Sequence, residues 1–381
     1  MNKEKFIYLD NNSTTRLDSA VFDAMAPWFM EFYGNTGSPN PNGIAAAAAV
    51  ELARKKLRLI FNIPEGEILF SPSSTVSINT AIAGIAFGSY PKKDHLITQT
   101  TEHPAVLETM KYLSSLGFQI TILPVDNLGF IDPAQLKSAI TDKTILVSLM
   151  AANNEIGTLQ PLKEAGAICM EKEVLFHSDV TQAAGRYRID ANELNLDLIS
   201  GGGHKIHGPK GIGYLALRNA DLVSNIVPLL QGGGQEKALF PGTLNVPLIV
   251  GLSKALEITC ENRETENAFL KRFSDAFREV LENEGVDFRI NGPEERLVNN
   301  LSIVFTGVKS STMLSNIRQV AFSAGSACSA GTESHVLKAI NLSHEDINST
   351  LRFGFSRFNT EDEVKEAAGI VAKFIKSQRQ P

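Results

Sequence analysis

Between residues 15 and 255 the chain alternates short, nearly continuous apolar runs with stretches that are typical of helices. Apolar runs of this length and continuity are typical of strands that are buried on both faces. Strands that alternate with helices predict a mostly parallel sheet covered by helices. We therefore predict an α/β fold with a large domain over residues 15–255, whose strands are expected at 67–72, 94–100, 118–125, 143–152, 173–179, 196–200 and 211–218.

The pattern changes after this segment. Residues 246–285 are helical and rich in charge, and they precede two further strand-like runs at 299–305 and 349–355. A helix around 310–317 and a last helix near the C-terminus complete this part of the chain. We predict a smaller α+β domain made of residues 1–14 and 256–381.

Composition limits the function classes. The 381 residues carry a net charge of −6, which gives no overall basic field to attract nucleic acid or an anionic membrane. No apolar run reaches the ~18 residues that span a bilayer, and no secretory signal is visible near the start. The cysteines have no metal-ligand spacing and form no evident disulfide framework. We expect a cytoplasmic enzyme that binds neither nucleic acid nor membrane and holds no metal.

Polar side chains follow successive predicted strands at the point where each strand ends. Ligands of open α/β sheets bind at the carboxyl ends of the strands, so these side chains are expected to share one edge. In chain order they are Ser74 and Thr75, then Glu102 and His103, then Asn153, Asn154 and Glu155, then Asp179 and Gln182, and finally His204 and Lys205.

Each of these residues also has an ordinary structural interpretation. Ser74 and Thr75 could cap a helix, His103 could be a loop histidine, and Asp179 could cap a helix. Lys205 and its neighbour Lys210 could be solvated in a glycine-rich turn. Their convergence favours a pyridoxal phosphate (PLP) site, which requires a lysine for the Schiff base, a carboxylate for the pyridine nitrogen and a cradle for the phosphate. The Walker spacing and the Rossmann glycine pattern are both absent.

Several motifs resemble those of class V PLP enzymes, and specifically of bacterial cysteine desulfurases that supply sulfur for iron–sulfur clusters. The resemblance runs over nearly the whole chain. The motifs, in chain order, are YLDNNSTTRLD, TEHPAVL, NNEIGTLQP, HSDVTQAAG, GHKIHGPKGIG, PGTLN, GSACS and LRFGFSRFNTEDEV.

This resemblance implies the PLP-dependent transferase fold of type I, a homodimer and a role for each motif residue. Lys205 would form the Schiff base and abstract the Cα proton of L-cysteine, and Cys328 would take the substrate sulfur as a persulfide, leaving alanine. The sulfur would then pass to an acceptor or iron–sulfur scaffold protein. His103 would stack on the cofactor ring and also act in catalysis by shuttling a proton. The remaining implied roles are cofactor and substrate contact for Asn154, the pyridine nitrogen for Asp179, the phenolic oxygen for Gln182, a site neighbour in His204, the partner subunit's phosphate for Thr243 and the substrate carboxylate for Arg352.

The chain departs from the family pattern around the expected phosphate cradle. The run SPSSTVSIN stands where the family usually has Gly or Ala, then Thr, Glu, Ser and Asn, so Thr75 is kept while Val76 replaces the acidic residue. Gly202 stands where a phosphate-binding serine is usual, which predicts a lower affinity for the cofactor.

Other departures lie elsewhere in the chain. Asn40 replaces a common histidine, and Gln235, Lys237 and Phe240 stand where a histidine and two arginines are usual, which affects the expected dimer edge. The loop after Cys328 is about two residues shorter than in the long-loop type, although its start resembles that type. A shorter loop is expected to restrict the choice of acceptor protein.

Two other functions remain open at this point. One is a different class V enzyme, such as a selenocysteine lyase or a small-amino-acid aminotransferase; transamination would not need the thiol of Cys328. The other is a weakly active or non-catalytic subunit of a sulfur-transfer complex, which would bind PLP weakly or not at all.

Overall fold

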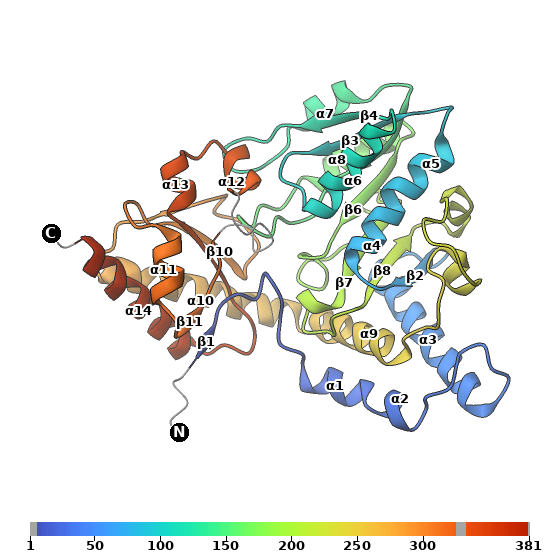
Figure 1. The fold of residues 1–381 in the computed structure, drawn as a ribbon, viewed down its shortest axis with the longest axis horizontal. Helices are drawn as coiled ribbons and strands as arrows, with labels where there is room; N and C mark the ends of the chain where they lie inside the picture. Colours follow the sequence, from blue (N-terminus) through green and yellow to red (C-terminus); the bar gives the residue numbers. More distant parts are fainter. Residues whose placement is uncertain (1–5, 325–332, 380–381) are drawn as a thin grey trace.

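A computed structural model describes residues 6–324 and 333–379. Its largest element is a seven-stranded sheet of order β2-β8-β7-β6-β5-β3-β4 (Figure 1). Neighbouring strands from β4 to β7 are parallel, whereas β8 is antiparallel to both β7 and β2. The strands are β2 (Glu67–Ser71), β3 (His95–Gln99), β4 (Gln119–Leu123), β5 (Thr144–Ser148), β6 (Leu175–Asp179), β7 (Leu198–Gly202) and β8 (Gly213–Leu217). The predicted mostly parallel sheet is confirmed.

Helices cover both faces of this sheet because successive strand residues point to opposite sides. On β2, Ile68 belongs to one apolar cluster and Leu69 to another. The first cluster includes side chains of α1 (Ser19–Met25), α3 (Pro41–Ile60), α7 (Pro133–Ala139), α8 (Leu162–Glu171) and α9 (Val246–Glu261). The second includes side chains of α4 (Ser74–Asn79), the π-helical turn η1 (Thr80–Gly84), α5 (Ile85–Ser89) and α6 (Pro104–Ser115).

Local capping explains where several of these helices begin. Asp132 accepts a hydrogen bond from the Ala134 N–H, and Pro133 occupies the first turn of α7. Asn40, one of the departures from the family pattern, accepts from the Gly43 N–H and begins α3. The short helix α2 (Pro27–Met30) follows α1 directly.

The other part of the structure contains an antiparallel sheet of order β12-β10-β9 and a parallel pair of β1 with β11 (Figure 1). Its strands are β1 (Ile7–Tyr8), β9 (Arg289–Ile290), β10 (Asn300–Val304), β11 (Val320–Ala321) and β12 (Thr350–Gly354). Its helices are α10 (Arg263–Asn283), α11 (Ser310–Asn316), α12 (His335–Ala339), α13 (His344–Asn348) and α14 (Glu361–Arg379).

A separate apolar core includes Phe277 of α10, Phe353 of β12 and Val371 of α14. The helices α12 and α13 instead belong to a small cluster with Ile156. The helical segment expected over 246–285 is divided at Asn262, where α9 ends and α10 begins. The division of the chain at residues 14/15 and 255/256 stays a prediction. Among the described residues, no helix combines the length and apolar character that crossing a membrane requires.

Candidate active site

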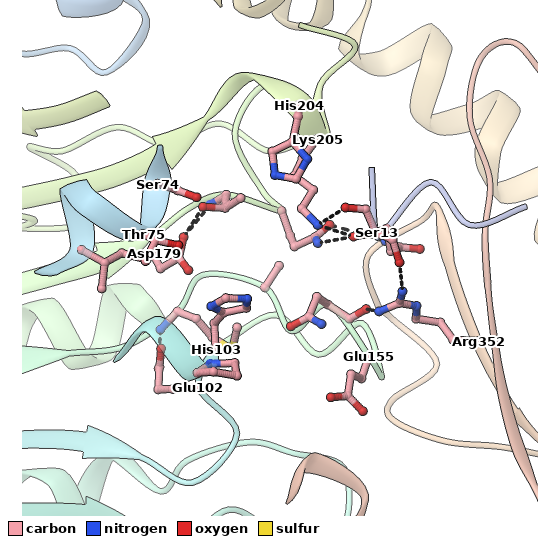
Figure 2. A pocket seen from close by; sticks show the side chains of 18 of the residues that line it. Ser13, Ser74, Thr75, Glu102, His103, Glu155, Asp179, His204, Lys205 and Arg352 are labelled. Carbon is pink, nitrogen blue, oxygen red and sulfur yellow. Dashed lines mark hydrogen bonds between the residues drawn. The ribbon is translucent and has the colours of Figure 1, made fainter. Parts of the chain in front are cut away.

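A pocket of about 290 Å³ lies at the carboxyl edge of the large sheet (Figure 2). Strands β2, β3, β5, β6 and β7 end at this edge because they run in the same direction. The predicted site residues that line the pocket are Ser74, Thr75, His103, Asn154, Asp179, Gln182, His204, Lys205 and Arg352. Residues that are scattered over the chain therefore meet in one pocket.

Lys205 is the last residue of η2 (Gly203–Lys205), a short 3₁₀ turn that follows β7 directly. Its Nζ donates hydrogen bonds to the carbonyl oxygens of Asn12 and Ser13, both at 2.6 Å. Lys210 is exposed and does not line the pocket. Of the two lysines in the glycine-rich stretch, Lys205 is the one held inside the pocket.

Asp179 is the last residue of β6 and is only 6% exposed. Its Oδ1 accepts from the N–H and the Oγ1 of Thr181, at 2.9 and 2.5 Å. Its Oδ2 makes no hydrogen bond within the described chain, and Asp179 lines the pocket. A carboxylate oriented in this way can accept a hydrogen bond from a protonated ring nitrogen.

His103 begins α6, and its Nδ1 accepts from the Ala105 N–H at 3.1 Å. The neutral ring must therefore carry its proton on Nε2. Burial lowers the pKa of His103, and the Asp179 carboxylate partly opposes this effect. Burial and the nearby Lys205 lower the pKa of His204 to about 4, so both rings are neutral near pH 7.

Arg352 lies on β12 and brings the smaller sheet to the pocket. It is 1% exposed, and its guanidinium donates to Asp10 Oδ1 at 3.1 Å, Ser13 Oγ at 2.6 Å and Asn154 O at 2.9 Å (Figure 2). Its Nε has no partner among the described residues. These contacts connect Arg352 to the N-terminal segment and to the loop after β5.

Gln182 is fixed by the N-terminal segment too. Its Nε2 donates to the Asn12 carbonyl oxygen at 3.0 Å. Asn12 thus accepts from both Gln182 and Lys205. Sequence reasoning missed Asn12 and Ser13 as site residues, although both lie in the opening motif YLDNNSTTRLD that carries part of the resemblance.

Three further ionisable residues line the pocket. The sequence placed Glu102 and Glu155 at this edge without a role, and it missed His335. Glu155 is buried and its Oε2 accepts from Ser334 Oγ at 2.5 Å. His335 Nε2 lies 2.9 Å from the carbonyl oxygen of Glu102. Burial raises the pKa of both carboxyl groups, that of Glu102 to about 8.

The raised pKa of Glu102 predicts a pH-dependent stability. The folded chain holds this proton more tightly than the unfolded chain, whose carboxyl has an ordinary pKa near 4.5. The stabilisation is therefore fully present below about pH 4.5 and is lost as the pH rises through about 8. Glu102→Gln mimics the protonated acid, so the free energy of unfolding should fall less between pH 5.5 and pH 8.5 in this variant. Urea unfolding at the two pH values would measure this difference.

The exposed Glu164 provides the control for this experiment. Glu164→Gln should leave the difference in unfolding free energy between the two pH values as it is in the unsubstituted chain. If the Glu102→Gln variant showed the same difference in unfolding free energy between the two pH values as the unsubstituted chain, the idea that Glu102 holds a proton would be contradicted.

Of the predicted site residues that the structure describes, only Thr243 does not line this pocket. Thr243 is exposed and borders a separate hollow beside the aromatic side chains of Trp28, Phe29 and Tyr33. This placement is compatible with a contact to a second subunit, which stays a prediction. Cys328 falls outside the described residues.

The residues that depart from the family pattern near the expected dimer edge have local structural roles. Phe240 is buried in the apolar cluster over α4 and α6. Lys237 forms an ion pair with Glu67 at 3.4 Å. The neighbouring Glu236 is buried and accepts hydrogen bonds from Arg54 and from the Phe70 N–H. These bonds hold a segment in which Glu236, Lys237 and Ala238 have positive φ.

The donor set of the pocket fits PLP. A lysine amine, an available carboxylate oxygen, an imidazole, an amide and two hydroxyls at the start of α4 are the groups that this cofactor requires. Gly213 permits the close approach of β8 to this helix start, because a Cβ there would meet the Ser73 and Ser74 backbone. The hydroxyl expected at position 202 is missing.

Comparison with known proteins agrees with this geometry. The sequence pattern of the family described as aminotransferase class V matches residues 7–366. The cysteine desulfurase IscS of Rickettsia felis is 42% identical over 378 residues, which cover 98% of this chain and 92% of that protein. This chain belongs to the cysteine desulfurase family. The predicted resemblance, the PLP dependence and the enzyme class are thereby confirmed.

Solved structures support the same fold. A NifS-like protein is 35% identical, matches 98% of this chain and all of its own, and superimposes with a TM-score of 0.90. A protein named SspA, solved in complex with cysteine, is 33% identical over 93% of this chain and all of its own, with a TM-score of 0.80. The predicted type I fold is confirmed.

Proposed function

We propose that this pocket converts L-cysteine to L-alanine and that Cys328 receives the sulfur. The observation that carries the proposal is the convergence of Lys205, Asp179, His103 and Arg352 in one pocket. Four separate segments supply these groups, and each side chain is held at the pocket by a hydrogen bond within the chain.

The bound PLP supplies an electron sink that stabilises negative charge at the substrate Cα. Asp179 would hold the pyridine nitrogen, Gln182 the phenolic oxygen and His103 the ring face. Asn154 and His204 would line the cofactor, and Ser74 and Thr75 would hold the phosphate. The neutral state of His103 avoids placing a second cation against the ring.

Lys205 would accept the proton from the substrate Cα, because an uncharged amine at the pocket can act as a general base. Arg352 would bind the substrate carboxylate, for which a planar guanidinium is the suited donor. The Cys328 thiolate would attack the substrate sulfur: an S–S bond forms, the Cβ–S bond breaks with its electron pair staying on carbon, and proton transfer completes alanine.

The assembly belongs to the proposal as well. We propose a homodimer in which Thr243 reaches the partner's site, supported by the exposure of Thr243 and of its neighbours Phe29 and Tyr33. We further propose a cytoplasmic enzyme that passes its persulfide sulfur to an acceptor or iron–sulfur scaffold protein. The net charge of −6 favours neither nucleic acid nor membrane as a partner.

The function is tested by assaying alanine and sulfide together, with L-cysteine and a reductant. Equal amounts of the two products would support desulfuration. Alanine in the absence of sulfide, or no yellow absorbance from bound cofactor, would contradict it.

Replacing Cys328 with Ser should abolish sulfide release, because serine cannot accept the sulfur. The yellow absorbance of the cofactor should stay unchanged. The buried Cys169, whose pKa burial raises to about 12, provides the control. Cys169→Ser should retain sulfide release. Release that survives in the Cys328→Ser variant would rule out this thiol.

A further inference from the structure

Gly202 is a glycine that neither the backbone nor the surrounding space requires. Its φ of −150° and ψ of 157° are extended values that any residue adopts. A Cβ at this position would lie 3.4 Å from Ser74 Oγ and 3.5 Å from the Ile212 carbonyl oxygen, which are ordinary contacts. By contrast, a Cβ on Gly201 would collide with Tyr214, and one on Gly203 would lie 2.9 Å from the Pro209 carbonyl oxygen.

The nearest group to this open space is the side chain of Ser74. Ser74 is the first residue of α4, and it lines the pocket together with Thr75 (Figure 2). A serine at 202 would therefore place its hydroxyl, one bond beyond Cβ, next to the hydroxyl that Ser74 already provides.

The Ser74 hydroxyl is available for a ligand, unlike those of its neighbours. Ser73 caps α4 by accepting from the Val76 N–H, and Ser77 shares a hydrogen bond of 2.6 Å with Ser71. Within the described part of the chain, Ser74 Oγ has no hydrogen-bond partner, and its side chain is only partly buried. A hydroxyl in this situation can donate to an anion without giving up another bond.

We propose that the Ser74 hydroxyl donates a hydrogen bond to the cofactor phosphate and so replaces the hydroxyl that residue 202 would usually supply. The exchange moves the donor from the end of β7 to the start of α4 while keeping it at nearly the same point in the pocket. This inference rests on the proposed function. It also explains two departures from the family pattern as one: Gly202 stands where serine is usual, and Ser74 stands where Gly or Ala is usual.

The test is a titration of the full chain, freed of cofactor, with PLP while the cofactor absorbance is followed. Ser74→Ala should raise the dissociation constant of PLP about 10-fold, the effect of one lost hydrogen bond to a charged group. The double variant Ser74→Ala/Gly202→Ser should bring the constant back to within about 3-fold of the unsubstituted chain. A Ser74→Ala variant with unchanged affinity, or a double variant without recovery, would overturn the exchange.

Pyridoxal, which lacks the phosphate, separates a phosphate contact from a general structural effect. Its dissociation constant should be the same for the unsubstituted chain and for Ser74→Ala; an equal weakening of both ligands would overturn the proposal. Ser77→Ala is the matched control, since its hydroxyl is directed at Ser71, and it should leave PLP affinity unchanged. If the unsubstituted chain itself bound no PLP, the proposed function would fail. If the unsubstituted chain bound PLP but the Ser74 variants did not show the expected changes in dissociation constant, the function would stand and this inference alone would fail.

Discussion

Lys205→Ala should lower alanine formation at least ~1000-fold, because it removes both the covalent attachment of the cofactor and the base at Cα. Reduction with borohydride followed by mass spectrometry should find the cofactor attached to the unsubstituted chain and not to the variant. The structure supports the choice of this lysine, since its Nζ is held at the pocket by the Asn12 and Ser13 carbonyl oxygens.

Lys210→Ala is the control for this experiment. Lys210 lies in the same glycine-rich stretch but is exposed and outside the pocket. It should retain both turnover and the borohydride-dependent attachment. Attachment that persists in Lys205→Ala would show that another lysine carries the cofactor.

Arg352→Ala should reduce both folding stability and substrate binding. The side chain of Arg352 is 2% exposed and pairs with Asp10, so its removal leaves that carboxylate without its cation and should cost ~3 kcal/mol of unfolding free energy. The KM for L-cysteine should rise roughly 30-fold or more, because the donor for the substrate carboxylate is lost. Urea unfolding and steady-state kinetics measure the two effects.

Arg352→Lys separates these effects. A lysine keeps the positive charge beside Asp10, so most of the stability should return. It lacks the planar fork that reaches Asp10, Ser13 and Asn154 together, so the KM should stay high. A normal KM in Arg352→Lys would contradict a role for the guanidinium in carboxylate binding.

The strands of the large sheet could be predicted from the sequence because their signal is local. Each strand is a short apolar run, and such a run indicates a buried strand without reference to the rest of the chain, as the run that forms β5 does. The strands β1 and β11 have two residues each and could not be predicted, since so short a segment has no periodicity. The antiparallel direction of β8 was not predictable either, because strand direction depends on where the chain returns to the sheet.

The site was predictable to the extent that its residues follow strand ends or carry a family motif. Asp179 and Lys205 meet both conditions. His335 was missed because its contact with the Glu102 carbonyl oxygen joins segments far apart in the chain. Such a pairing leaves no pattern in either segment.

The sequence by itself determined which chemical groups this protein carries, the alternation of strands and helices along the large sheet, and its family. These depend on residue type and on spacing along the chain, which folding does not alter. Only the tertiary structure decided that Asp10 and Arg352, which are 342 positions apart, share a hydrogen bond, and that Ser74 lies beside the space left open at Gly202. Contacts of this kind arise when separate elements pack against one another, so their geometry depends on both partners and is not encoded in either segment alone.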